Sequence, residues 1–434
     1  MKKKLAALLL LAALLLCGCT GPAKRTVPSS PALPEETAAN KIDQTGKPVE
    51  PVEPASDVTS GKTSEKPAGK EGKVSFLAAG DVLIHEAVFT DAMARATALA
   101  GTNGYSEKYE FLSMFEGVAS TVKAADLSFV NFECPIAGDD QGARGYPNFN
   151  APTASGKAIV ELGFDVVNIA NNHMLDMDGI TKGLDKTIDF WKTQPVLTVG
   201  GYTESDWDEL RMVEKNGLKI AFLSYTYGTN YGSVNTSRGA IVPTFKESRM
   251  EAQVKAARAA ADFVVVSMHW GDETSYATDL TKPNSTQKRL AQLLCDWGAD
   301  AIIGTHPHVV QDVEWYSSGD HKMLCYYSLG NFISTQHPYS NLVGGFASFE
   351  IVKGADGVCR AEKALLIPNA TWYSKQRDSL SVMLLQDMTE EKVAAHGSQL
   401  RSDYNGKSSY DLSDLYSLVK KQVSAAYLPD FMQN

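Results

Sequence analysis

The chain has 434 residues, of which 44% are hydrophobic and 9% aromatic, so it contains enough apolar material to bury a sizeable core. Its formal net charge of −10 argues against nucleic acid as the main partner, because phosphate backbones are bound by basic surfaces.

The first residues are typical of an export signal. A basic start (MKKK) precedes an apolar run that ends in LCGC at residues 16–19 and is too short to span a bilayer comfortably. A small residue before Cys19 is typical of a lipoprotein. We therefore expect a signal peptide over residues 1–18, lipidation of Cys19, and an extracytoplasmic protein that is lipid-anchored to the cell membrane. An ordinary secretory signal with an incidental cysteine is the alternative.

Residues 19–73 are rich in Pro, Glu, Lys, Thr and Ser and have hardly any large apolar side chain, which predicts a flexible, lipid-anchored tether. The four cysteines beyond it form no CxxC pair. Buried free thiols are the expected state, and a Cys325–Cys359 bridge stays open as an alternative.

From residue 74 onward, short apolar strand-like runs alternate with helical patterns. Helices are predicted over 109–125, 154–163, 179–193, 250–261 and 285–298, each followed by a strand-like run. A hairpin with an Asn216–Gly217 turn is predicted over 213–227, and residues 322–333, 344–352 and 359–373 look like antiparallel strands. The alternation predicts β-α-β units in an α/β domain over 74–375, followed by a helical extension over 376–434 with helices at 389–404 and 411–427.

Polar side chains collect just after the apolar runs. Because the carboxyl ends of parallel strands meet at one edge of a sheet, we expect these side chains to share a pocket. They are Asp81, His85, Asn131, Glu133, Asn171, Asn172, His173, His269, His306 and His308, with Asn331 after a later strand as a further candidate.

Each of these residues also has an ordinary structural explanation, such as a turn Asp or Asn, or a core histidine with its hydrogen bonds made. Glu133 at the end of a buried strand is costly unless a positive group meets it, which favours a metal. The pair His306 and His308 flanks a proline, and imidazole suits zinc, iron and manganese. Asn131 is expected to be a structural hydrogen-bonding residue, while His85 is either a ligand or a substrate contact.

Six blocks occur in a fixed order: AAGDV (78–82), NFECPI (131–136), GFDVVNIANNHMLD (163–176), VVVSMHWGDE (264–273), GTHPHVVQ (304–311) and YSLGNFI (327–333). Together they resemble the capsule-synthesis protein CapA family, which is associated with poly-γ-glutamate capsule export and anchoring. That family is similar to the calcineurin-like metallophosphoesterases. The resemblance implies a four-layer α/β/β/α sandwich with a metal site at the strand ends.

The resemblance also implies roles for individual residues. His173 stands where the phosphoesterases have a general acid, and one or two divalent transition-metal ions (Mn, Fe or Zn) are expected. The implied metal ligands are Asp81, Glu133, Asn172, His269, His306 and His308, with His85, Asn131, Asn171 and Asn331 as possible accessory residues. Two departures leave the number of ions open: Leu83 replaces a phosphoesterase histidine, and Glu133 replaces a bridging aspartate. A mononuclear site and a second metal completed by His85 or water are equally consistent.

The implied function is an envelope-anchored role in synthesis, export or anchoring of an anionic capsule polymer such as poly-γ-glutamate, with a metal-dependent hydrolase- or transferase-type site. The alternative is a non-catalytic polymer-binding or assembly subunit on a degenerate phosphoesterase scaffold, so whether the chain is an enzyme stays open. Expected partners are the polymer, the membrane through the lipid anchor, and membrane-bound polymer synthase subunits.

Overall fold

The first predicted strand begins at Lys73 in the computed structural model, which describes residues 71–102, 104–231, 239–273, 279–400 and 409–433. The predicted signal peptide, Cys19 and all but the last three residues of the predicted tether lie outside these ranges. None of the helices within the described ranges is long and apolar enough to cross a membrane.

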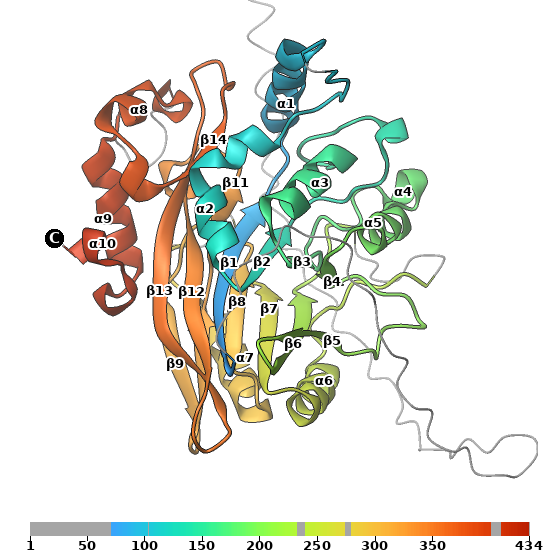
Figure 1. The fold of residues 1–434 in the computed structure, drawn as a ribbon, viewed down its shortest axis with the longest axis vertical. Helices are drawn as coiled ribbons and strands as arrows, with labels where there is room; N and C mark the ends of the chain where they lie inside the picture. The colour runs from blue at the N-terminus through green and yellow to red at the C-terminus, as the bar shows by residue number, and fades with distance from the viewer. Residues whose placement is uncertain (1–70, 103, 232–238, 274–278, 401–408, 434) are drawn as a thin grey trace, which may run out of the picture. The chain divides into compact units, whose positions relative to one another are not determined.

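The first sheet has eight strands in the order β14-β13-β12-β1-β2-β3-β4, with β11 also pairing with β1 (Figure 1). Five of its strands run parallel to one another: β1 (Lys73–Val82), β2 (Leu127–Phe132), β3 (Val166–Asn168), β4 (Leu197–Val199) and β11 (Asn331–Ile333). The other three continue the sheet antiparallel: β12 (Val343–Lys353), β13 (Cys359–Trp372) and β14 (Ser381–Leu384).

The second sheet has six strands in the order β5-β6-β7-β8-β10-β9. Its central strands are parallel: β6 (Leu218–Thr226), β7 (Phe263–His269), β8 (Ala301–Thr305) and β10 (His321–Tyr326). The edge strands β5 (Arg211–Lys215) and β9 (Val313–Ser318) are antiparallel to their neighbours. The predicted hairpin is confirmed, because Asn216 and Gly217 have φ of 49° and 76° between β5 and β6.

The side chains of the central strands alternate between two cores, as the pleat of a strand requires. In β1, Phe76 and Ala78 face the core between the two sheets, where the Phe76 ring lies 6.2 Å from Phe222 of β6, while Leu77 and Ala79 face the opposite side. In β7, the residues on either side of Val264 face the inter-sheet core, and Val264 itself packs into a third core. Strands buried on both faces are typical of sheets covered by helices.

Helices cover the outer face of each sheet. The first sheet packs against α1 (Glu86–Leu99), α2 (Glu116–Ala124), α3 (Thr153–Leu162) and α5 (Gly183–Lys192), with the short α4 (Asp178–Thr181) before α5. The second sheet packs against α6 (Glu247–Ala260) and α7 (Ser285–Trp297). The predicted four-layer α/β/β/α sandwich is therefore confirmed. The C-terminal helices α8 (Glu390–Ala395), α9 (Leu412–Gln422) and α10 (Asp430–Gln433) lie together beside β13 (Figure 1).

Several local predictions differ from the structure. Residues 322–333 are antiparallel only in part: β10 runs antiparallel to β9 but parallel to β8 in the second sheet, and β11 runs parallel to β1 in the first. The helix predicted at 389–404 ends at Ala395, followed by a 3-10 turn at Gly397–Leu400, and residues 401–404 lie outside the described ranges. Helix α1 begins directly after His85, which is its N-cap residue. The prediction of free thiols is confirmed, because Cys134, Cys295, Cys325 and Cys359 are all buried free cysteines.

Candidate metal centre

The predicted site residues lie at the carboxyl edge where the parallel strands of the two sheets end. Asp81 near the end of β1 is in register with Asn131 of β2 on one side and Asn331 of β11 on the other. This close pairing requires glycine at position 80, since a Cβ there would lie 1.9 Å from the carbonyl oxygen of Gly330. The Asp81 amide then donates to that same carbonyl at 2.9 Å, which holds β11 against β1 beside the site.

Two sets of metal-competent side chains share Glu133. One set is Glu133, His269 and His306, and the other is Asp81, Glu133 and His308; in each, one ligand atom per residue lies within 4.8 Å of the others, and all five residues are buried. The two histidines of the THPH turn therefore divide between the sets. Both have positive φ, 98° and 57°, a strained conformation that concentrates at functional sites.

Asn172 adjoins the first set. Its Nδ2 donates to Oδ1 of Asn230 at 3.3 Å, which fixes the orientation of the amide. Its Oδ1 lies 2.9 Å from Nε2 of His269, so the oxygen faces the ligand group as the sequence predicts for a ligand.

A buried hydrogen-bond network holds the two carboxylates. Asn131 donates through Nδ2 to Oδ1 of Asp81 at 2.7 Å and to Oε2 of Glu133 at 3.2 Å. Its Oδ1 accepts from Nδ2 of Asn168 at 2.8 Å, and the hydroxyl of Ser224 donates to the Asn168 oxygen. Asn131 therefore orients the carboxylates, and its own oxygen is already engaged by Asn168. Asn168 and Ser224 were missed by sequence reasoning, although each is a polar residue inside an otherwise apolar strand.

The electrostatics of the site fit a bound cation. Oε1 of Glu133 and Nδ1 of His306 are buried and have no hydrogen-bond partner among the described residues. Burial, and next the charge of Asp81, raise the pKa of Glu133 well above its usual range. Burial lowers the pKa of His269 and His306, and the neighbouring histidines lower it further. Buried polar atoms without a hydrogen bond are costly, and a divalent ion bound by Glu133 would satisfy the carboxylate oxygen.

The donor set of carboxylate, imidazole and amide oxygen fits a divalent transition metal such as zinc, iron or manganese. Either set would hold one ion, and the two sets together would share Glu133 between two ions. His308 differs from the other two histidines, because the hydrogen bond and charge of Asp81 outweigh the effect of burial and raise its pKa.

His173 lies next to this centre and is paired with a carboxylate that the sequence reasoning missed. Its Nδ1 lies 2.7 Å from Oδ2 of Asp176, which also accepts the Phe149 amide at 2.9 Å. The Phe149 ring packs edge-on against His173 at 4.8 Å. Asn171 shapes the turn, since its Oδ1 accepts the His173 amide at 3.0 Å and its Nδ2 donates to the Phe132 carbonyl. An acidic residue three positions after the histidine was the available signal for Asp176.

His85 belongs to neither ligand set. Its Nδ1 accepts the Thr335 amide at 3.3 Å, so the neutral ring carries its proton on Nε2 and is a donor. Burial, and then the charge of His308, lower its pKa to about 3. This geometry favours the substrate-contact alternative over the ligand alternative. Glu273 was also missed: its Oε2 lies 3.5 Å from Nε2 of His306.

Asn331 lies beside Asp81 on β11. Its Nδ2 donates to Oε1 of Gln336 at 2.9 Å and to the Asn341 carbonyl at 3.0 Å. Farther along the same segment, His337 accepts a hydrogen bond from Nη2 of Arg377 at 2.6 Å. Arg377 is therefore bonded to the same segment that contacts His85 through the Thr335 amide.

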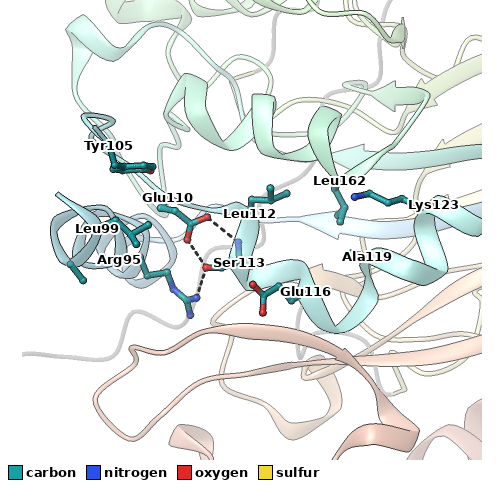
Figure 2. Close-up of a pocket in the computed structure, with 11 residues that line it drawn as sticks. Arg95, Leu99, Tyr105, Glu110, Leu112, Ser113, Glu116, Ala119, Lys123 and Leu162 are labelled. Atoms are coloured by element: carbon teal, nitrogen blue, oxygen red, sulfur yellow. Dashed lines mark hydrogen bonds between the residues drawn. The ribbon is translucent and has the colours of Figure 1, made fainter. Parts of the chain in front are cut away.

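A second cavity lies away from this centre. It has a volume of about 710 Å³ and is lined by apolar and charged side chains of α1, of the segment that connects α1 to α2, of α2 and of the end of α3. Figure 2 shows its polar group, in which Arg95 donates to the hydroxyl of Ser113 at 2.7 Å and the Ser113 amide donates to Glu110 at 2.9 Å. None of the predicted site residues lines this cavity.

Solved structures with a similar fold include proteins from Thermus thermophilus. A 5'-nucleotidase precursor from that organism is 12% identical, with a TM-score of 0.41 over 81% of this chain and 58% of that one. A hypothetical protein from the same organism is 18% identical, with a TM-score of 0.39 over 68% of this chain and 98% of that one.

Two curated relatives are closer in sequence. The capsule biosynthesis protein CapA of Bacillus anthracis is 33% identical over 54% of this chain and 56% of that protein, so the match spans little more than half of its length. The PGA biosynthesis protein CapA of Bacillus subtilis (strain 168) is 29% identical over 71% of this chain and 78% of that protein. The family model for the bacterial capsule synthesis protein PGA_cap matches residues 75–336, which hold every residue of both ligand sets, and the chain belongs to this family.

Proposed function

We propose that this protein acts in the synthesis, export or anchoring of an anionic capsule polymer such as poly-γ-glutamate, and that its buried centre is a metal-dependent hydrolase- or transferase-type site. The observation that carries the chemical part is the sharing of Glu133 between two buried ligand sets. A buried carboxylate with one oxygen that accepts no hydrogen bond destabilises the fold unless it meets a cation. A bound transition metal would supply Lewis acidity and an activated water.

His173 and Asp176 supply the proton chemistry in this proposal. The carboxylate of Asp176 holds a proton on Nδ1 of His173 and leaves Nε2 as the atom that carries the transferable proton. In hydrolysis of a γ-glutamyl amide, water oxygen bonds to the carbonyl carbon, the carbon–nitrogen bond breaks, and Nε2 of His173 protonates the leaving nitrogen. The proton that the attacking water releases replaces the one that His173 has given up, so the products are a carboxylic acid and an amine. A phosphoester would use the same proton for its leaving oxygen.

One positive group and one neutral donor fit an anionic substrate. Arg377 is the positive group, and it donates to His337, two residues after Thr335, whose amide contacts His85. The neutral ring of His85 offers Nε2 as a donor. The net charge of −10 gives no broad attraction for a polyanion, so recognition would rest on such local groups. Each residue of poly-γ-glutamate carries a free α-carboxylate, which a guanidinium binds well.

Location and partners belong to the same proposal. The LCGC segment supports lipidation of Cys19 and anchoring outside the cytoplasmic membrane. Membrane-bound polymer synthase subunits would then be neighbours in the same membrane. Cys19→Ser should shift the protein from the detergent phase to the aqueous phase in a detergent partition assay, and unchanged partitioning would contradict lipid anchoring at this residue.

The test of the site uses the full-length chain purified in detergent, wild type and His173→Ala, incubated with zinc and poly-γ-glutamate. We expect wild type to shorten or transfer the polymer, measured by its size and by new amino groups, and His173→Ala to bind polymer but lose turnover. The matched control is His321→Ala, which removes a histidine at the opposite end of the strands. Polymer binding without turnover in wild type would favour the non-catalytic alternative.

A further inference from the structure

Asp81 is flanked in register by two asparagines that present opposite chemistry. Side chains of registered residues on adjacent strands project to the same face of a sheet, so Asn131 and Asn331 both lie beside Asp81. Asn131 directs its Nδ2 donor to the carboxylate at 2.7 Å. An ionised carboxylate only accepts hydrogen bonds, so the Nδ2 donor of Asn131 suits it.

On the other side, Asn331 is held with its donor turned away. Nδ2 is occupied by Oε1 of Gln336 and by the Asn341 carbonyl, both acceptors, so the amide cannot rotate without placing oxygen against oxygen. Gln336 is itself fixed, because the same Oε1 accepts from Nδ2 of Asn341 at 2.9 Å. The amide orientation of Asn331 is therefore set by its surroundings.

The oxygen left over is buried and unsatisfied. Asn331 is 1% exposed, and its Oδ1 makes no hydrogen bond of good geometry with the described residues. The backbone cannot move to relieve it, since β12 approaches so closely that a Cβ on Gly344 would lie 2.0 Å from the Asn331 carbonyl oxygen. A buried acceptor fixed next to a buried carboxylate is unfavourable unless a cation lies between them.

The set formed by Asp81, Glu133 and His308 also lacks one ligand, which this oxygen could supply. Leu83 stands where the phosphoesterases carry a histidine, and it is buried in the core on the helix side of the first sheet. The set therefore contains three protein ligands, and a fourth would complete a tetrahedral centre.

We propose that Asn331, through its side-chain oxygen, is a metal ligand of the Asp81, Glu133 and His308 set, in place of the missing phosphoesterase histidine. This inference rests on the proposed metal centre and goes beyond it by assigning one ligand and its orientation. Gln336 and Asn341 act as positioning residues that hold the oxygen toward the ion.

The test compares Asn331→Leu with Asn331→Asp in the full-length chain. Both variants lose the Nδ2 donors and with them the contacts to Gln336 and Asn341, but only Asp keeps an oxygen. Zinc bound per chain is measured by mass spectrometry after gel filtration, and zinc affinity by titration calorimetry. Asn369→Leu is the control, because Asn369 is equally buried in β13 and belongs to neither ligand set.

We expect Asn331→Leu to weaken one zinc site by about tenfold or more, while Asn331→Asp and Asn369→Leu keep the wild-type zinc content. Wild-type zinc binding in Asn331→Leu would overturn the assignment and leave the proposed function intact. Absence of zinc binding in wild type would overturn both.

If Asn331→Leu does not fold, anomalous diffraction from zinc-soaked wild-type crystals decides the matter. An Asn331 Oδ1 about 2.0–2.2 Å from a zinc ion supports the assignment, and a distance of about 3 Å or more refutes it.

Discussion

Replacing Glu133 by Gln should stabilise the metal-free protein and abolish most of its stabilisation by metal. The substitution keeps the shape of the side chain and an oxygen that can accept from Asn131, but it removes the charge. Because burial and the neighbouring Asp81 raise the pKa of Glu133 well above 4.5, the native metal-free protein retains a proton that the unfolded chain has released. The unfolding free energy therefore falls as the pH rises above 4.5, until the native pKa is passed.

The cost of the Glu133 charge without metal and the stabilisation by bound metal have opposite signs and comparable sizes. Without metal, the penalty on wild type grows by up to about 1.4 kcal/mol for each pH unit in that window, and Gln carries no such penalty. With zinc at about 100 times its dissociation constant, wild type gains about 2.7 kcal/mol. For the roughly 360 residues from 71 to 433, an unfolding entropy of about 2.1 cal/mol/K per residue converts this gain to a rise of about 3.5 °C in Tm.

The assay is thermal unfolding followed by circular dichroism at about pH 7.5, in EDTA and in zinc. We expect the order of stability to reverse: Glu133→Gln melts above wild type in EDTA and below it in zinc. The reasoning would be refuted by a variant that melts below wild type in EDTA and gains as much as wild type from zinc. That result would mean that Glu133 stabilises the fold without a cation.

Three further substitutions test other parts of the structure. Asp176→Asn should lower any turnover by about 10²–10⁴-fold with zinc content unchanged, and an equal loss of zinc would contradict a role confined to His173. Gly80→Ala should lower both Tm and zinc content because the new methyl would lie 1.9 Å from a backbone oxygen, so a wild-type melting curve would contradict the close pairing of β11 with β1. Burial lowers the pKa of His396 from 6.5 to about 4, so its neutral ring should contribute stability that is present above pH 6.5 and lost as the pH falls towards 4, at most about 3 kcal/mol. Urea denaturation in EDTA at about pH 7 and about pH 5 should show this loss in wild type and not in His396→Gln.

Much of the architecture follows from local patterns in the sequence. Alternating apolar runs and helical periodicity predicted the α/β class, and the Asn–Gly pair predicted the β5–β6 hairpin, because turn chemistry and periodicity act over a few residues. The same patterns placed Asp81, Glu133 and His269 at strand ends. Since parallel strands of one sheet end at one edge, the convergence of Asp81 and Glu133 could be expected from the sequence, whereas His269 ends a strand of the other sheet.

Local patterns failed where one stretch of chain serves two sheets. Residues 322–333 were predicted to be antiparallel, and β10 does pair antiparallel with β9, yet β10 also pairs parallel with β8 and β11 pairs parallel with β1 in the other sheet. Strand partners are chosen by packing against distant segments, and periodicity alone cannot identify them.

By itself, the sequence determined which side chains reach the sheet edge, because strand length and parallel direction decide this locally. Only the tertiary structure decided what each of them does there. The bond between Asp81 and His308 joins residues 227 positions apart, and the sharing of Glu133 depends on bringing two sheets together. The orientations of the Asn131 and Asn331 amides are likewise set by neighbours from other strands and loops. The sequence does not determine those orientations, because the donors and acceptors around an amide decide where its oxygen and its nitrogen point.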